Sequence, residues 1–241
     1  GGEVVSWFPR FETFGAIVPL NVLPSLTWLS GLVWLEPDVM FYPMLDNTGD
    51  SIRATDIWSQ FGFRGENVTI AILDTGVDFA HESLDDLDDI SSTDDPKIAV
   101  DSEGKLAFYN ANTDKEYPEE QPHDSGSHGT HCAGIAAGTG GSSGTYAGVA
   151  PQARLAGVIA LDGGGGDTND LLRSVNWTIA NRDRFNIRVM SLSLGGPVVI
   201  PGATNDGQSS ISRALDNAVE NGIVTTVAIG NGNLGIAAHP S

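Results

Sequence analysis

Four largely apolar runs, rich in β-branched residues, are spaced along the chain from residue 57 onward. They span Val68–Leu73, Arg154–Leu161, Ile187–Leu194 and Ile223–Ile229. Apolar runs of this length, without polar alternation, are typical of strands that are buried on both faces. We therefore predict four strands in the interior of one sheet.

Segments with helical spacing separate these runs. In one of them, apolar residues recur at i, i+3, i+4, i+7 and i+8, namely Ile211, Ala214, Leu215, Ala218 and Val219. Ser209 or Ser210 is its expected N-cap and Gly222 its expected C-cap. A second helix is predicted around Leu172, Val175 and Ile179, capped by Asp167 or Thr168, and a third, rich in small residues, over His128–Ala137.

Strands that alternate with helices favour a parallel sheet covered by helices. From residue 68 the predicted order is strand, acidic loop, helix, strand, helix, strand, helix, strand. The predicted fold class is α/β: a doubly wound, mostly parallel sheet with helices on both faces.

Residues 1–45 differ from the remainder, because they hold few charges and three of the five tryptophans. A strand is predicted at Phe14–Leu20, a short helix at Asn21–Ser30 and a strand at Leu32–Glu36, with a further strand at Glu3–Phe8. Residues 46–56 are predicted to be an exposed connector. We expect a small α/β piece (1–45), this connector and a main domain (57–241).

The formal net charge of −19 excludes nucleic acids and anionic membrane surfaces as expected partners, because both require basic protein surface. Between residues 82 and 124, 14 acidic residues face three lysines. Their oxygens suit Ca²⁺, although a run of charges is more commonly a solvated surface. No apolar run reaches the roughly 18 residues that span a membrane. A single cysteine, Cys132, excludes an internal disulfide.

Polar residues follow three of the predicted strands. Asp74 comes directly after the first, Ser193 and Gly195 lie at the end of the third, and Asn231 follows the fourth. Ligands of open α/β sheets bind at the carboxyl ends of the strands. His128, at the start of its helix, can reach the same edge.

Five motifs, in order and with matching spacing over residues 57–241, resemble the subtilisin-like serine proteases. Ile72–Asp78 (ILDTGVD) resembles the Asp box of that family, and Ser127–Gly134 (SHGTHCAG) resembles its His box. Gly148–Pro151, Ser191–Gly196 and Gly230–Gly232 resemble its turn after the His helix, its substrate-binding strand and its oxyanion turn.

The resemblance implies an endopeptidase that uses an Asp-His-Ser triad. His128 would be the general base, Asp74 would orient its imidazole, and the Asn231 amide would stabilise the oxyanion. Two segments would pair with the substrate backbone as added strands. Their residues would be Leu161, Asp162, Gly163 and Gly164 on one side and Ser193, Leu194 and Gly195 on the other.

One expected motif has no counterpart in the 241 residues. The family's Ser box reads roughly Gly-Thr-Ser-Met-Ala-x-Pro and should follow Asn231, since the triad order is Asp, His, Ser. We therefore predict a C-terminally truncated catalytic domain that is inactive by itself. The missing part would also supply the last strand and a buried helix.

Further expectations rest on the resemblance alone. Leu32–Asp38 (LVWLEPD) resembles the final strand of the family's propeptide, so residues 1–45 would be part of a propeptide that assists folding and inhibits the zymogen. Maturation would cut between Asp38 and Ile57. The protein would be secreted, act on proteins or peptides, need no cofactor for catalysis and hold structural calcium at unidentified ligands.

Two other function classes stay open. Asp74–Gly76 and Asp124–Gly126 are two Asp-[Thr/Ser]-Gly motifs, as in aspartic proteases, whose two carboxylates share a proton. The chain could also belong to a non-catalytic pseudoenzyme or binding module that has the subtilisin fold.

The remaining histidines and the cysteine are given structural roles. His131 is predicted to pack in the core, and the spacing of His128 and His131 lacks the third ligand of a catalytic zinc site. His81, His123 and His239 are predicted to lie at the surface. Cys132, one turn after His128, is expected to be a small buried apolar residue that makes the complete enzyme sensitive to mercurials.

Overall fold

A computed structural model describes residues 2–8, 13–26, 28–32, 35, 50–87, 95–163, 165–195 and 209–228. The chain divides into two compact units, Gly1–Pro43 and Met44–Ser241. Among the described residues, no helix is both long and apolar enough to cross a membrane.

The N-terminal unit contains an antiparallel hairpin of β1 (Glu3–Phe8) and β2 (Thr13–Ile17). A 3-10 turn, η2 (Leu20–Val22), leads into α1 (Leu23–Leu26). The predicted strand and helix of this region are therefore present but shorter than expected. Of the predicted strand at 32–36, only Leu32 and Leu35 are described, and neither lies in a strand.

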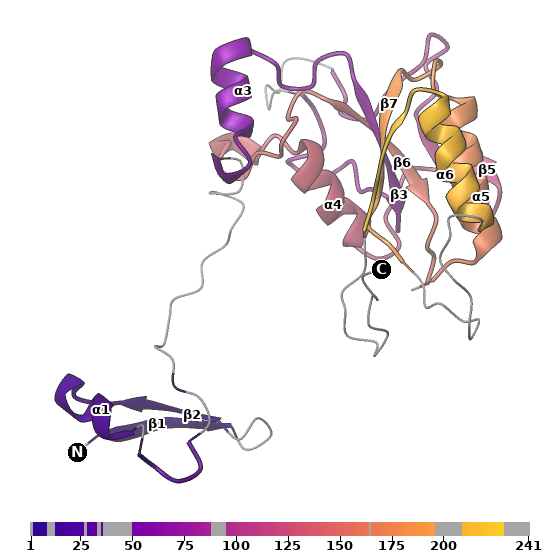
Figure 1. The fold of residues 1–241 in the computed structure, drawn as a ribbon. Coiled ribbons are helices and arrows are strands. Elements are labelled where there is room, and N and C mark those ends of the chain that lie inside the picture. The colour runs from indigo at the N-terminus through magenta and orange to yellow at the C-terminus, as the bar shows by residue number, and fades with distance from the viewer. Residues whose placement is uncertain are drawn as a thin grey trace. The chain divides into compact units, whose positions relative to one another are not determined.

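The second unit is built on a six-stranded sheet with the order β5-β4-β6-β3-β7-β8 (Figure 1). Four strands correspond to the predicted runs: β3 (Thr69–Asp74), β6 (Arg154–Ile159), β7 (Ile187–Leu192) and β8 (Val224–Val227). The pairs β3–β6, β3–β7, β7–β8 and β4–β6 are parallel. The predicted mostly parallel α/β sheet is confirmed.

Alternate residues of β3 pack into two different layers. Ala71 and Leu73 belong to the cluster beneath α5 (Thr168–Ala180) and α6 (Ser210–Glu220). Ile70 and Ile72 belong to the cluster beneath α4 (His128–Ala137). Because successive strand residues point to opposite faces, this strand joins both hydrophobic layers, and helices cover both faces of the sheet.

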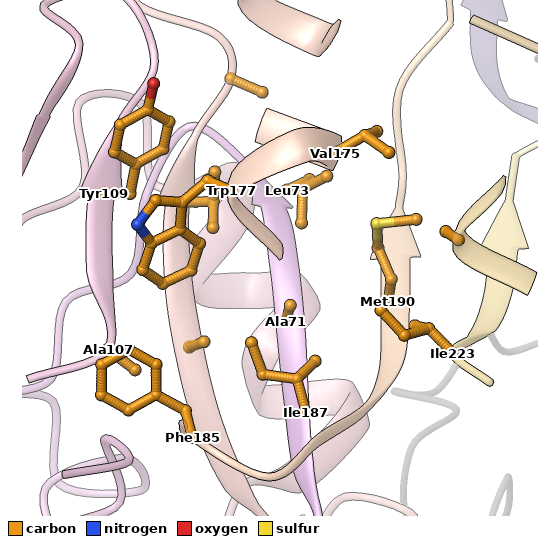
Figure 2. Packing of buried hydrophobic residues seen from close by; sticks show 14 of the residues in the cluster. Ala71, Leu73, Ala107, Tyr109, Val175, Trp177, Phe185, Ile187, Met190 and Ile223 are labelled. Carbon is orange, nitrogen blue, oxygen red and sulfur yellow. The ribbon is translucent and has the colours of Figure 1, made fainter. Parts of the chain in front are cut away.

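Three aromatic residues pack together in the larger, mostly aliphatic cluster (Figure 2). The ring of Trp177 in α5 stacks on Tyr109, with centroids 5.5 Å apart, and lies 5.9 Å from the ring of Phe185. Tyr109 comes from β4 and Phe185 from the loop before β7. The stack therefore ties α5 to one end of the sheet.

Two strands and one α-helix were not predicted. β4 (Phe108–Asn110) and β5 (Lys115–Glu116) form an antiparallel pair inside the stretch that was expected to be an acidic loop. α3 (Ala54–Phe61) begins inside the expected connector 46–56, which is therefore wrong at its C-terminal end. The α3 residue Trp58 donates from its indole nitrogen to the carbonyl oxygen of Val149, 3.0 Å away, and this bond anchors the helix.

The predicted caps are largely confirmed. Asp167 caps α5, accepting from the backbone nitrogens of Asn169 and Asp170 in a capping box. Ser209 caps α6, whose C-cap is Asn221 rather than the predicted Gly222. Gly222 instead follows the cap with φ +78°, a left-handed conformation that favours glycine.

One strand differs from its prediction. The apolar character of β8 predicted burial on both faces, yet Val224 is 63% and Val227 is 47% exposed. β8 is the edge strand of the described sheet, paired with β7 alone. A strand's composition shows that it can be covered, but not which segment covers it.

Candidate active site

Three neighbouring strands, β6, β3 and β7, deliver the predicted site residues to one edge of the sheet. Asp74 is the last residue of β3, Leu161 follows the end of β6, and Ser193 follows the end of β7. The backbone oxygen of Asp74 accepts from the nitrogens of Ala160 (2.8 Å) and Leu161 (3.0 Å). These hydrogen bonds fix the main chain of Asp74 against the segment that follows β6.

The Asp74 carboxylate and the His128 imidazole meet directly. Nδ1 of His128 lies 2.7 Å from Oδ1 of Asp74, which also accepts from the backbone nitrogen of Thr75 at 2.8 Å. The Asp74 side chain is 1% exposed, whereas that of His128 is 53% exposed. A buried carboxylate therefore holds Nδ1 of an imidazole that remains half-exposed to solvent.

Two glycines allow α4 to approach the end of β3. A Cβ on Gly129, which follows His128, would lie 2.0 Å from the backbone oxygen of Gly76 and 3.1 Å from Cβ of Asp74. A Cβ on Gly76 would lie 2.2 Å from the backbone oxygen of His123. Gly76 also has φ +110°. Any side chain at Gly129 would push the helix away from the Asp74 loop.

Cys132 lies beside this pair, half-buried, with Sγ 3.8 Å from Nδ1 of His128. Burial raises the pKa of its thiol, which is therefore protonated at neutral pH. Asp74, His128 and Cys132 are the described residues whose potential ligand atoms gather within 4.8 Å. Zinc binds thiolate, and Nδ1 of His128 already contacts Asp74, so this arrangement is a hydrogen-bonded pair beside a thiol rather than a preformed metal centre.

The predicted substrate-binding residues flank the pair at the same sheet edge. Asp162 and Gly163 are exposed, and Leu161 is half-buried. Asp162 pairs with Gly165 through two backbone hydrogen bonds of 2.8 and 3.2 Å. Gly164 and Asn231 lie outside the described residues.

The segment after β7 flanks the pair on the opposite side from Leu161. Ser193 and Gly195 are exposed and Leu194 is half-buried. Solvent can therefore reach this backbone, as pairing with a substrate strand would require. The binding roles of both segments stay predictions.

The prediction that His131 packs in the core is wrong, because this residue is exposed. The buried residues of α4 are Gly129, Ala133 and Ala137, which follow one another at i+4. His131 is two residues from Gly129 and points to the opposite side of the helix. His81 and His123 are exposed, as predicted, and His239 lies outside the described residues.

In the described part of the acidic stretch, the acidic side chains do not form a cluster of metal ligands. Among the residues on either side of the gap at 88–94, no three acidic side chains bring ligand oxygens together. Asp85 and Asp101 instead accept hydrogen bonds from nearby backbone nitrogens. Structural calcium therefore stays a prediction.

Known proteins are similar to this chain in sequence. The family model described as "Subtilase family" matches residues 65–240. Subtilisin E of Bacillus subtilis is 28% identical over 235 residues, which cover 96% of this chain and 52% of the relative. The serine protease AprX of the same species is 35% identical over 172 residues, covering 69% of this chain and 34% of the relative.

Solved structures have the same fold. The CspB protease of Clostridium perfringens aligns with a TM-score of 0.58 at 22% identity, covering 76% of this chain and 40% of that structure. The S41 psychrophilic protease aligns with a TM-score of 0.51 at 25% identity, covering 74% and 52%. The chain spans about half the length of the curated subtilisins that it matches. With the family model matched over most of its residues, the chain belongs to the subtilase family of serine proteases.

Proposed function

We propose that this chain supplies the Asp-His part of a serine endopeptidase that hydrolyses peptide bonds through an acyl-enzyme. The observation that carries the proposal is the contact of 2.7 Å between the buried Asp74 carboxylate and Nδ1 of the half-exposed His128. A base held at one nitrogen and open at the other is what activation of a serine hydroxyl requires.

The chemistry of each group follows from this geometry. Asp74 accepts from Nδ1–H, selects that tautomer and stabilises the imidazolium formed during the reaction. Nε2 takes the proton of the serine hydroxyl and later returns it to the leaving amine. Asn231 is proposed as the oxyanion donor, and the segments 161–164 and 193–195 as the strands that pair with an extended peptide.

The nucleophile itself is proposed to come from a Ser box, a motif that the 241 residues do not contain. We therefore expect the chain alone to hydrolyse no peptide bonds. Residues 1–45 are proposed to act as a propeptide toward the rest of the chain.

Relatives include both the "Minor extracellular protease Vpr" and the "Major intracellular serine protease". We propose secretion, with structural calcium as a second, separately testable expectation.

A serine-directed fluorophosphonate probe tests the function. We expect no labelling of the 241-residue chain and clear labelling once its reading frame is extended through the next roughly 60–120 codons, a span estimated from the resemblance to the family, in which the serine follows the Asp and the His. His128→Ala in the extended protein should reduce labelling about 10²–10⁴-fold, because it removes the general base. Cleavage of casein by the purified 241-residue chain would refute the proposed division of the triad.

The same assay separates the alternatives. An extended protein without a Ser box, and without labelling, would favour the pseudoenzyme. Inhibition by pepstatin-type compounds would favour the aspartic protease. The parallel sheet and the family match favour the serine enzyme, since aspartic proteases are built from β-structure.

A further inference from the structure

Asp124, four residues before His128, has a carboxylate that accepts five hydrogen bonds. Three come from backbone nitrogens at the start of α4: those of Gly126, Ser127 and Thr130, each at 2.9 Å. The other two come from the hydroxyl groups of Thr75, at 2.6 Å, and Thr130. Ser127, at the N-cap position, makes no side-chain cap. Asp124 therefore satisfies the helix start in its place.

The Thr75 hydroxyl connects this carboxylate to both members of the proposed catalytic pair. It donates to Asp124 and accepts from the backbone nitrogen of Gly129 at 2.9 Å. The backbone nitrogen of Thr75 donates to the Asp74 carboxylate. Because a hydroxyl has a single proton, Asp124 sets its direction and leaves a lone pair for Gly129, the neighbour of His128.

The Thr130 hydroxyl repeats this arrangement from the other element. It donates to Asp124 and accepts from the backbone nitrogen of Asp78 at 2.9 Å. One threonine thus comes from the loop after β3 and the other from α4, and each is oriented by the same carboxylate. The two links join the Asp74 loop to the His128 helix on both sides of Asp124.

The carboxylate is suited to this position because it stays ionised. Burial alone would raise the pKa of Asp124, but the hydrogen bonds from Thr130, Thr75 and the backbone outweigh it and hold the pKa below its ordinary value. An ionised carboxylate accepts at both oxygens, so neither threonine has to compete for it.

We propose that Asp124 is the positioning residue of the Asp74–His128 pair, fixing the distance and orientation of the two side chains through Thr75 and Thr130. The value of this positioning for catalysis rests on the proposed function. The positioning itself concerns only the orientation and tautomer of the His128 imidazole. It also gives Asp124 a role other than the second carboxylate of an aspartic protease.

The test measures the tautomer of His128 in the 241-residue chain by long-range ¹H–¹⁵N correlation spectra, assigned with His128→Gln. We expect the wild type to hold the Nδ1–H tautomer that Asp74 accepts. Asp124→Ala should lose this preference and give the mixture of tautomers seen in an unconstrained histidine. Asp124→Asn, which is isosteric and keeps one oxygen acceptor, should give an intermediate population.

Asp167→Ala is the matched control, because Asp167 caps α5 through two backbone nitrogens but has no link to the pair. It should lose a helix cap and keep the His128 tautomer. The proposal is overturned if Asp124→Ala and Asp124→Asn keep the wild-type tautomer, if Asp167→Ala loses it equally, or if the wild type shows no preference. If Asp124→Ala does not fold, Asp124→Asn decides.

The experiment needs no nucleophile and no catalytic turnover. Failure of fluorophosphonate labelling together with a tautomer that depends on Asp124 would refute the proposed function and leave the positioning role in place. Labelling together with an unchanged tautomer in the Asp124 variants would support the proposed function and refute the positioning role of Asp124.

Discussion

Replacing Gly129 by alanine tests how closely the His128 helix must approach the Asp74 loop. In an ordinary helix, Gly→Ala stabilises by about 0.5–1 kcal/mol, because alanine loses less backbone entropy. At this position, however, the new Cβ would lie 2.0 Å from the backbone oxygen of Gly76. Real Cβ atoms do not approach oxygen so closely, so the helix or the loop must move.

Forcing an extra carbon into a packed site costs about 1–3 kcal/mol. Gly129→Ala should therefore destabilise the chain by about 1–2 kcal/mol after the helix-propensity gain is subtracted. Gly134→Ala in the same helix is the matched control, since its Cβ would meet nothing within 4 Å. This variant should be more stable than wild type by about 0.5–1 kcal/mol.

Urea unfolding of the three proteins, followed by circular dichroism, measures the difference. The two variants should differ by about 1.5–3 kcal/mol in unfolding free energy with similar m-values. Gly129→Ala should also shift the Nδ1 resonance of His128, while Gly134→Ala should not. Equal stability of the two variants would refute the close approach of Gly129 to Gly76, and with it the packing proposed for this site.

Three other changes test separate parts of the second unit. The buried Thr69 hydroxyl donates to a backbone carbonyl at 2.6 Å, so Thr69→Val should lower the unfolding free energy by about 1–2 kcal/mol, and an unchanged urea midpoint would contradict this. Hydrogen bonds from the backbone nitrogen of Lys105 and from Arg184 lower the pKa of Asp101. The ionised Asp101 therefore stabilises the folded chain at neutral pH, and this stabilisation is lost as the pH falls through the folded-state pKa. Asp101→Asn should therefore cost most at pH 7 and progressively less toward pH 3 in urea titrations; a constant difference would argue against it. Burial raises the pKa of Cys132, so its alkylation by iodoacetamide should have a pH midpoint above that of the same thiol in urea-unfolded chain, and an equal or lower midpoint would count against the burial.

The central strands and their helices could be predicted because burial on both faces gives the strands unbroken apolar runs, and burial of one face gives the helices a regular apolar spacing. β3 has no polar residue before Asp74 except the buried Thr69, and α5 and α6 carry both caps and apolar spacing. β4 and β5 were missed because they are only three and two residues long and lie among charged residues. A pair this short has too few positions to show alternation.

The site was predictable only in part. The Asp and His boxes located Asp74 and His128, but spacing alone could not show that the two side chains touch. The exposure of His131 could have been inferred, since it lies off the stripe of small residues Gly129, Ala133 and Ala137 that α4 buries. The sequence marks Asp124 only as part of a second Asp-Ser-Gly motif, because its partners Thr75 and Thr130 come from two separate elements.

Because β3 is packed on both of its faces, the Asp74 carboxylate can become exposed to solvent only in certain ways. A hydrophobic cluster covers each face of β3, and the backbone oxygen of Asp74 accepts hydrogen bonds from the nitrogens of Ala160 and Leu161. Local opening of a loop cannot free such a group; both hydrophobic layers must come apart together. Asp74 should therefore stay buried until the whole second unit unfolds, even where the surrounding surface segments open and close many times.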